Sequence, residues 1–178
     1  MALMEVKYII ETERLFLREL RSSDAEKMYD LNSDPDVVKF TGDIPFTSIE
    51  SARAFLEKYD EYKKQGYGRW AVITKDSNEF IGWCGLKYNE EKYTDIGFRF
   101  FRKEWNKGYA TEAAKATLEY GFSVLKLNEI IGRASTDNKP SIRVLEKLKM
   151  SFWKLDKCDG IENSSYFRIS KAQYDRWK

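Results

Sequence analysis

The segment from residue 93 to residue 135 constrains the fold of this 178-residue chain more than any other. Residues 93–101 alternate in the way typical of a β-strand, residues 109–126 carry apolar side chains at helical spacing, and 129-EIIGRAS-135 again resembles a strand. A strand, a helix and a second strand in this order predict a parallel pair joined by a right-handed crossover. The sheet should therefore contain a parallel pair at its centre.

The other strands are predicted to add antiparallel neighbours to this unit, because short turns join them. They are expected over residues 13–20, 68–75, 80–87, 151–158 and 164–170, the last two forming a hairpin around Asp159 and Gly160. Helices are predicted over residues 22–32 and 48–66, from Pro140 to Leu148, and within 171–178, and the segment 33–47 is expected to be irregular. We therefore expect one domain over residues 1–178, of the α/β (α+β) class, with helices on both faces of a mixed, mostly antiparallel sheet.

The absence of histidine narrows the possible chemistry more than any other count. Histidine is the commonest general base and the commonest metal ligand, so Ser-His-Asp and Cys-His mechanisms are excluded within one chain, and no metal is expected. The two cysteines, Cys84 and Cys158, match no metal-binding spacing, and we expect free thiols in a cytoplasmic protein.

Charge and hydropathy argue against two further classes of partner. The 31 basic and 29 acidic residues nearly balance, whereas nucleic-acid-binding proteins normally carry a clear basic surplus. No run of about 18 apolar residues occurs, so neither a membrane span nor a membrane partner is expected. The start, MALMEVKYII, lacks the pattern of a secretory signal.

The turn inside 104-EWNKGYATEA-113 has features of an anion-binding site. Gly108 permits a tight turn and the close approach of a ligand, and Asn106 tolerates left-handed backbone conformations. The first turn of a helix also presents N–H groups that can surround a diphosphate. A plain strand-to-helix connection would use the same residues. Neither GxxxxGK[ST] nor GxGxxG occurs, so the familiar nucleotide motifs are missing.

Several motifs in register resemble those of the GNAT N-acetyltransferases, and in particular the RimJ/RimL-like branch that acetylates ribosomal protein N-termini. Gly108-x-Ala110, preceded by Trp105, resembles the Q/R-x-x-G-x-G/A loop that binds acetyl-CoA in this family. The resemblance runs from residue 12 to about residue 150 and includes Thr12-Glu13-Arg14-Leu15, Phe80-Ile81-Gly82, Ile96-Gly97-Phe98, Trp105 to Ala113, and Glu146-Lys147-Leu148. It implies the GNAT acyl-CoA N-acyltransferase fold, which agrees with the strand order above.

The resemblance also implies how acetyl-CoA binds as co-substrate. Its pantetheine arm is expected along the backbone of the strand at 93–101 and its diphosphate at the amides of the following turn. Asn106 replaces the first glycine of the family's W-G-K-G, and binding is expected to survive the change. Core packing is an alternative role for the side chains of Phe98 and Phe100. The implied cofactor-binding residues are Phe98, Arg99, Phe100, Asn106, Lys107, Gly108, Tyr109, Ala110, Thr111 and Asn138.

The implied reaction is direct attack of a primary amine on the acetyl thioester in a ternary complex. The tyrosine that protonates the leaving thiolate in many GNAT enzymes aligns with Leu145, and Ser141 is the nearest hydroxyl. Asp95 is the first candidate for a base and Glu112 the second. An ion pair with Lys or Arg is the alternative role for Asp95, interaction with the helix dipole for Glu112, and a helix-start role for Ser141.

The acceptor is expected to enter between the early helices and the last hairpin, against Phe40, Phe46 and Trp83. A protein N-terminus, a polyamine, an amino acid or an antibiotic amine would all suit, and the protein is expected to be a monomer or a homodimer. Two other functions stay open at this point: a non-catalytic acyl-CoA-binding module, and a nucleotide-binding domain that uses the same turn.

Overall fold

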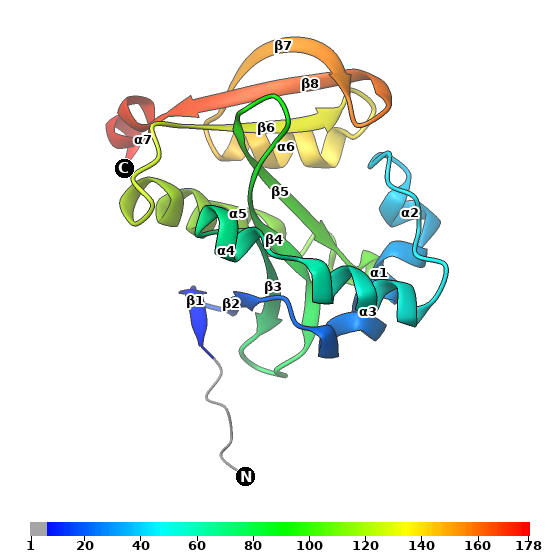
Figure 1. Cartoon of the computed structure of the whole chain (residues 1–178). Helices are drawn as coiled ribbons and strands as arrows, with labels where there is room; N and C mark the ends of the chain where they lie inside the picture. Colours follow the sequence, from blue (N-terminus) through cyan, green and yellow to red (C-terminus); the bar gives the residue numbers. More distant parts are fainter. Residues whose placement is uncertain (1–6) are drawn as a thin grey trace.

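Eight strands form one sheet in the order β1-β2-β3-β4-β5-β6-β8-β7, in a computed structural model that describes residues 7–178. Residues 1–6 lie outside the described part. They include the start of the chain, for which no secretory signal is predicted. The strands are β1 (Tyr8–Glu11), β2 (Leu15–Glu19), β3 (Arg69–Thr74), β4 (Phe80–Tyr88), β5 (Thr94–Phe100), β6 (Glu129–Ser135), β7 (Ser151–Cys158) and β8 (Ile161–Ser170). Within residues 7–178, β5 and β6 are the one parallel pair of neighbours, so the predicted mixed sheet is confirmed (Figure 1).

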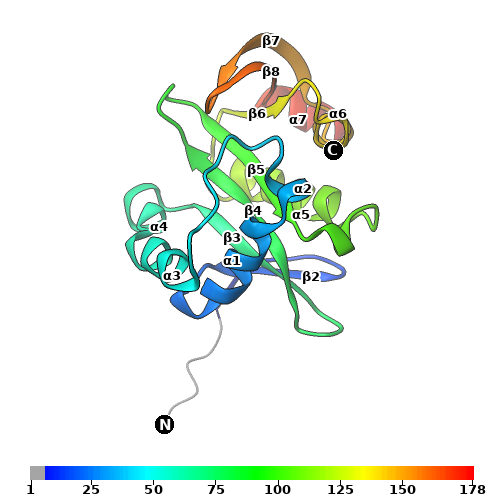
Figure 2. The ribbon, with the colours of Figure 1, turned by 90° about the vertical axis from the view of Figure 1, so that its right-hand side faces the viewer.

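Helices cover both faces of the sheet, as predicted. They are α1 (Ala25–Ser33), α2 (Pro35–Val38), α3 (Ile49–Lys58), α4 (Glu61–Gln65), α5 (Tyr109–Ser123), α6 (Lys139–Lys147) and α7 (Lys171–Trp177). Figure 2 shows α3 and α4 on one side of β3 and β4 and α5 on the other. Over residues 7–178, no helix is both long enough and apolar enough to cross a membrane.

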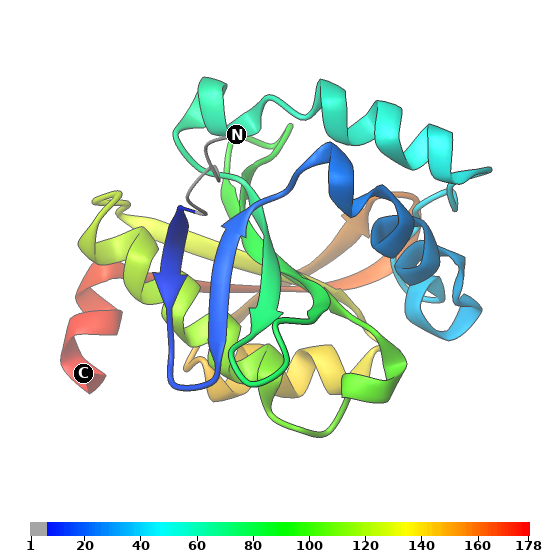
Figure 3. The ribbon, with the colours of Figure 1, turned by 90° about the horizontal axis from the view of Figure 1, so that it is seen from below.

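Strand β3 is buried on both faces and therefore separates two apolar cores. Trp70 and Val72 belong to the core beneath α5, whereas Ala71 and Ile73 belong to the core beneath α1 and α3. Alternate side chains of a strand point to opposite faces, which explains the division. Figure 3 shows the two groups of helices on opposite sides of the strands.

The helix predicted over residues 48–66 is broken in two. Tyr59 has an extended conformation (φ −72°, ψ 100°) and ends α3. Its hydroxyl accepts a hydrogen bond of 2.8 Å from the Arg69 N–H, and the Tyr62 hydroxyl lies 3.0 Å from the Leu20 N–H that donates to it. The two tyrosines thus bind to the sheet, and the break lets both reach it.

Two short elements were not predicted. Strand β1 pairs with β2, and Tyr8 stacks on Phe16 with ring centroids 4.1 Å apart. Helix α2 lies in the segment expected to be irregular, where the Asp34 side chain accepts a hydrogen bond from the Asp36 N–H and Pro35 occupies the first turn.

The sheet splits between β5 and β6. Their pairing is limited to Asp95 with Ile131 and Ile96 with Gly132. Beyond these pairs β5 stays paired with β4 as far as Phe100, and β6 stays paired with β8 as far as Ser135. The carboxyl ends of the two strands therefore diverge, and Figure 1 shows β5 descending away from β6 and β8. Crevices at the carboxyl ends of parallel strands are frequent ligand sites.

Candidate active site

Strand β5 presents backbone groups to the gap that opens beside β6. The Phe101 N–H donates to the Ile81 carbonyl of β4 at 3.1 Å, which sets the alternation along β5. Because antiparallel ladders alternate, the N–H groups of Phe98 and Phe100 point away from β4 and into the gap. The Arg99 N–H points toward β4, so the backbone contact with the cofactor that is expected for Arg99 is not available through this group. The Phe100 carbonyl on the side of the gap accepts a 2.9 Å hydrogen bond from the Trp105 indole. An extended ligand can therefore pair with Phe98 as another strand would.

The turn after β5 combines two left-handed residues with the start of a long helix. Asn106 has φ 63° and Gly108 has φ 83°, and both are exposed. Gly108 is the residue from which the 15-residue helix α5 starts. Left-handed residues at a helix start turn successive N–H groups toward one point, and the helix dipole favours an anion there. Phe98 and this turn are the two places where contacts with a pantetheine arm and a diphosphate are expected, and both expectations remain predictions.

Arg14, which directly precedes β2, contacts this turn through its side chain. Its Nη1 donates to the Lys107 carbonyl at 3.0 Å, and its guanidinium lies 4.5 Å from the centroid of the Tyr109 ring. Its Nε donates to Glu112 Oε2 at 2.7 Å. We call Thr12, Arg14 and Glu112 the clamp.

Glu112 uses both carboxylate oxygens within the clamp. Oε1 accepts from the Thr12 hydroxyl at 2.7 Å and from the Arg14 N–H at 2.9 Å, and Oε2 accepts from the Arg14 side chain. Partial burial raises the pKa of Glu112, and the hydrogen bonds and charge of the clamp more than offset it, so this pKa lies below the usual value. Its predicted role as a base remains a prediction, and the geometry favours positioning of the turn.

Asp95 lies at the point where β5 and β6 part, with 3% of its surface exposed. Its Oδ1 accepts from Arg69 at 2.6 Å and its Oδ2 accepts from the Arg133 Nε at 3.0 Å, so it links β3, β5 and β6. Burial raises the pKa of Asp95, but the two guanidinium groups outweigh that effect and hold it below the ordinary value. A carboxylate held in this way is a weak base, which favours the ion-pair alternative.

Helix α6 begins at the carboxyl end of β6, just as α5 follows β5. The Asn138 Oδ1 accepts a hydrogen bond of 3.2 Å from the Ser141 N–H and caps the helix. The Asn138 amide nitrogen and the Ser141 hydroxyl remain the groups of this cap that could reach a ligand. Leu145 is buried and packs against Gly132, where an added Cβ would meet it at 2.6 Å. The position of the family's tyrosine is therefore occupied by a core side chain.

A cavity of about 280 Å³ lies on the face of β5 that carries Arg99. Phe46 and Trp83, two of the three residues predicted to contact the acceptor, line this cavity, and their role remains a prediction. The third, Phe40, is outside the lining, with its ring centroid 5.2 Å from Lys39 Nζ. The residues that line the cavity are Leu20, Met28, Asn32, Asp43, Ile44, Phe46, Phe55, Tyr59, Arg69, Trp83 and Arg99.

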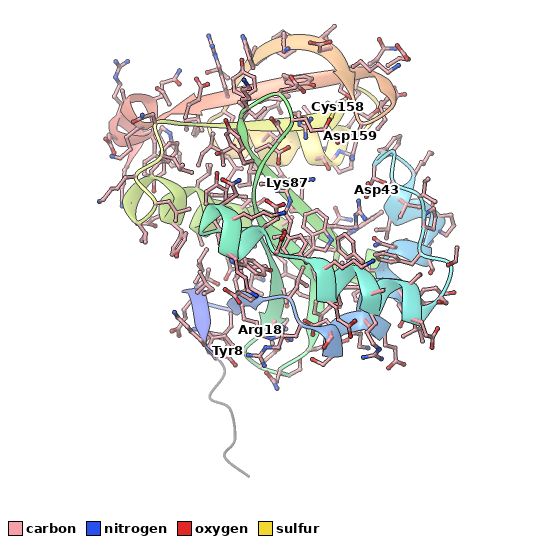
Figure 4. All side chains as sticks on the ribbon, in the orientation of Figure 1. Tyr8, Arg18, Asp43, Lys87, Cys158 and Asp159 are labelled. Carbon is pink, nitrogen blue, oxygen red and sulfur yellow. The ribbon has the colours of Figure 1, made fainter. Side chains whose placement is uncertain are left out.

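The segment after α2 meets the hairpin turn between β7 and β8. A Cβ added to Gly42 would lie 2.1 Å from the Asp159 carbonyl oxygen, so the two backbones are in contact. Figure 4 shows Asp43 on this segment facing the turn that carries Asp159. The predicted entry between the early helices and the last hairpin is thus crossed by a chain segment.

Sequence reasoning missed the Arg69 and Arg99 side chains in the cavity and the partners of Glu112. The alternation of β5 already placed Arg99 on the opposite face from Phe98 and Phe100, and this was the available signal for its side chain. Thr12 and Glu112 are 100 positions apart, so no local pattern predicts their contact. The one available signal was that each belongs to a motif of the family.

Comparisons with known proteins agree with this geometry. The family model of the acetyltransferase (GNAT) domain matches residues 14–151. The uncharacterized N-acetyltransferase p20 of Bacillus licheniformis is 36% identical over 148 residues, which cover 82% of this chain and 82% of the relative. A solved GNAT-family acetyltransferase from Bacillus anthracis is 36% identical, with a TM-score of 0.78 over 92% of this chain and 98% of that chain. A spermidine N-acetyltransferase from Vibrio cholerae, solved with CoA and spermine, shares the fold at a TM-score of 0.76 and 18% identity, over 92% of this chain and 99% of that chain.

Proposed function

The chain belongs to the acetyltransferase (GNAT) family and is an acetyl-CoA-dependent N-acetyltransferase, and we propose that it acetylates a small primary amine bound in the cavity beside β5. The split of the sheet between β5 and β6 carries this proposal, because it opens the backbone of Phe98 toward one ligand while the cavity receives another. The cavity lies slightly below the usual size of small-molecule sites, roughly 300–1,000 Å³. A small amine fits such a space better than the end of a protein chain.

In this proposal the residues of the chain bind and orient the two substrates. The Phe98 N–H donates to the thioester oxygen, on which negative charge develops during attack. The amides from Asn106 to Thr111 hold the diphosphate, and Asn138 contacts the pantetheine arm. The amine nitrogen bonds to the acetyl carbon and the carbon–sulfur bond breaks. The Ser141 hydroxyl passes a proton to the departing thiolate and recovers one from solvent, and solvent also takes the proton that the attacking nitrogen loses.

The amine requires little help from a protein base. The α-amino group of a peptide, with a pKa of about 7.7–8.0, is deprotonated at neutral pH for roughly 1 kcal/mol, whereas a lysine amine costs about 4.5 kcal/mol. The α-amine of a free amino acid, whose pKa is raised by its own carboxylate, lies between the two. Asp95 and Glu112 each form an ion pair with an arginine, so neither is well placed to act as the strong base that a lysine amine would need. The arrangement therefore favours an α-amine acceptor, which loses its proton to solvent.

The motifs in register also support the proposal that this chain is related to the RimJ/RimL-like branch of the family. We further propose that residues 1–178 form one domain. The clamp supplies a structural reason for two of these motifs, because it joins Thr12 and Arg14 of the first to Glu112 of the acetyl-CoA loop. The relationship concerns the scaffold, and the acceptor of that branch does not follow from it.

Release of CoA thiol from acetyl-CoA in the presence of amines tests the proposed function. The panel contains short peptides, polyamines, amino acids and aminoglycosides, with an amine-free control. We expect release above the control with at least one small α-amine, together with stabilisation of the fold by CoA and not by ATP or NAD. Stabilisation by CoA with no turnover of any amine would instead indicate a non-catalytic acyl-CoA-binding module, and stabilisation by ATP or NAD alone would indicate a nucleotide site.

A further inference from the structure

Arg99 is a nearly buried cation in the wall of the acceptor cavity. It lies on β5 between Phe98 and Phe100, and 9% of its side chain is exposed. Its guanidinium is 5.3 Å from the centroid of the Trp83 ring and donates hydrogen bonds to Asn32 Oδ1 and to the Asp43 carboxylate. A cation removed from water in this way requires an anionic partner, and Asp43 supplies it.

The partner is much less buried than the arginine. The Asp43 side chain is 54% exposed and belongs to the segment between α2 and α3, most of which has no regular structure. Exposed carboxylates contribute little to an ion pair, less than about fivefold in an equilibrium constant. A carboxylate on a ligand could therefore replace Asp43, which would return to water while Arg99 stays neutralised.

The other charges of the cavity favour an anionic group over a cationic one. Arg69 also lines the cavity, and its guanidinium lies 5.3 Å from the Trp83 ring. Among the described residues of the lining, Asp43 is the one carboxylate, and it is already paired with Arg99. Arg69 is neutralised by the buried Asp95, whereas Arg99 is neutralised only by the exposed Asp43. A polyamine would thus meet no unpaired anion, whereas a carboxylate could exchange with Asp43 at Arg99.

Apolar side chains supply much of the remaining lining, through Leu20, Met28, Phe46 and Phe55, beside the polar groups of Asn32 and Tyr59. Building on the proposed acetyl transfer, we infer that the acceptor is a free α-amino acid with an apolar side chain, whose carboxylate binds Arg99 in place of Asp43. In such a molecule one carbon separates the amine from the carboxylate. An amino acid held at Arg99 by its carboxylate therefore keeps its amine in the same cavity, on the strand that also carries Phe98.

The test compares amines that share an apolar side chain and differ in the carboxylate, with each rate referred to the fraction of neutral amine at the assay pH, because the amine pKa changes with the carboxylate. Leucine, leucinamide and isoamylamine form one set, phenylalanine, phenylalaninamide and phenethylamine a second, and spermidine serves as the polycation. We expect kcat/KM for at least one of the two amino acids to exceed that of its amide and its amine by about tenfold or more, the effect of one charge-assisted hydrogen bond. Spermidine should be the poorest acceptor.

Two variants with opposite effects separate binding from folding. Arg99→Met should raise KM for the preferred amino acid by about tenfold or more, with KM for acetyl-CoA unchanged, and Arg99→Lys should restore part of the loss. Asp43→Ala removes the internal competitor and should lower the same KM by up to about fivefold. A general loss of folding would not produce the second result.

Each outcome decides the inference. Equal kcat/KM for the acids and their carboxylate-free analogues, unchanged by Arg99→Met, would overturn it and leave the proposed acetyltransferase intact. Faster turnover of spermidine than of either amino acid would do the same. If CoA binds but no thiol is released with any amine, the proposed function is rejected, and the inference, which rests on it, is rejected as well.

Discussion

Replacing Gly108 by valine distinguishes a diphosphate-binding turn from a plain connection between β5 and α5. Gly108 has φ 83°, a conformation that a β-branched residue adopts only with strain of about 1–3 kcal/mol. The new Cβ would also lie 3.3 Å from Arg14 Nη2 of the clamp. The turn should relax by losing its left-handed conformation, and the N–H groups then no longer converge.

Binding of acetyl-CoA would then require the turn to return to its strained left-handed conformation. The cost of this strain, about 1–3 kcal/mol, raises KM for acetyl-CoA by about 5- to 150-fold. Steady-state kinetics with acetyl-CoA as the varied substrate measure the change, and kcat at saturation should stay close to that of the wild type. Gly66→Val is the matched control, because Gly66 has φ 78° and an added Cβ meets no heavy atom within 4 Å. Equal KM values in the wild type and both variants would refute a role of the Gly108 turn in binding.

Three further substitutions test the roles of the carboxylates and the serine. Asp95→Asn should lower the free energy of unfolding by about 3–5 kcal/mol, against at most about 1 kcal/mol for the exposed Asp175→Asn. Because the folded pKa of Asp95 is depressed, its contribution is present above about pH 4 and is lost below it, so denaturation curves of the wild type and Asp95→Asn should converge in acid. Glu112→Gln should raise KM for acetyl-CoA by about three- to tenfold with kcat unchanged; a fall in kcat alone would indicate the base role. Ser141→Ala should lower kcat more than it changes KM for acetyl-CoA, and normal turnover would leave Ser141 as a helix-start residue.

The central part of the fold could be predicted because its signals are local. The alternation of residues 93–101, the helical spacing of 109–126 and the strand after it fix a parallel pair without reference to the rest of the chain. The break between α3 and α4 could not be predicted in this way. Tyr59 and Tyr62 continue the helical spacing, whereas their hydroxyl groups bind Arg69 of the next strand and Leu20, which is 42 positions from Tyr62. These partners are set by the folded sheet and not by the helical pattern.

The same distinction between local and long-range signals applies to the candidate site. The turn from Asn106 to Gly108 could be predicted because backbone conformation depends on which residue types tolerate a positive φ, and both residues adopt it. The partners of Asp95 could not be chosen from the sequence, since Arg69 and Arg133 come from two other strands. The pairing of Arg99 with Asp43 likewise joins a strand to a segment 56 positions away.

Amide hydrogen exchange with and without CoA, followed residue by residue by NMR, tests most directly whether the ligand lies between β5 and β6. The N–H of Phe98 points into the gap, whereas that of Arg99 faces β4 and serves as an internal control. We predict that CoA slows exchange at Phe98 and across Asn106 to Thr111, with little change at Arg99. Unchanged exchange at Phe98 and at the turn under saturating CoA would contradict the account.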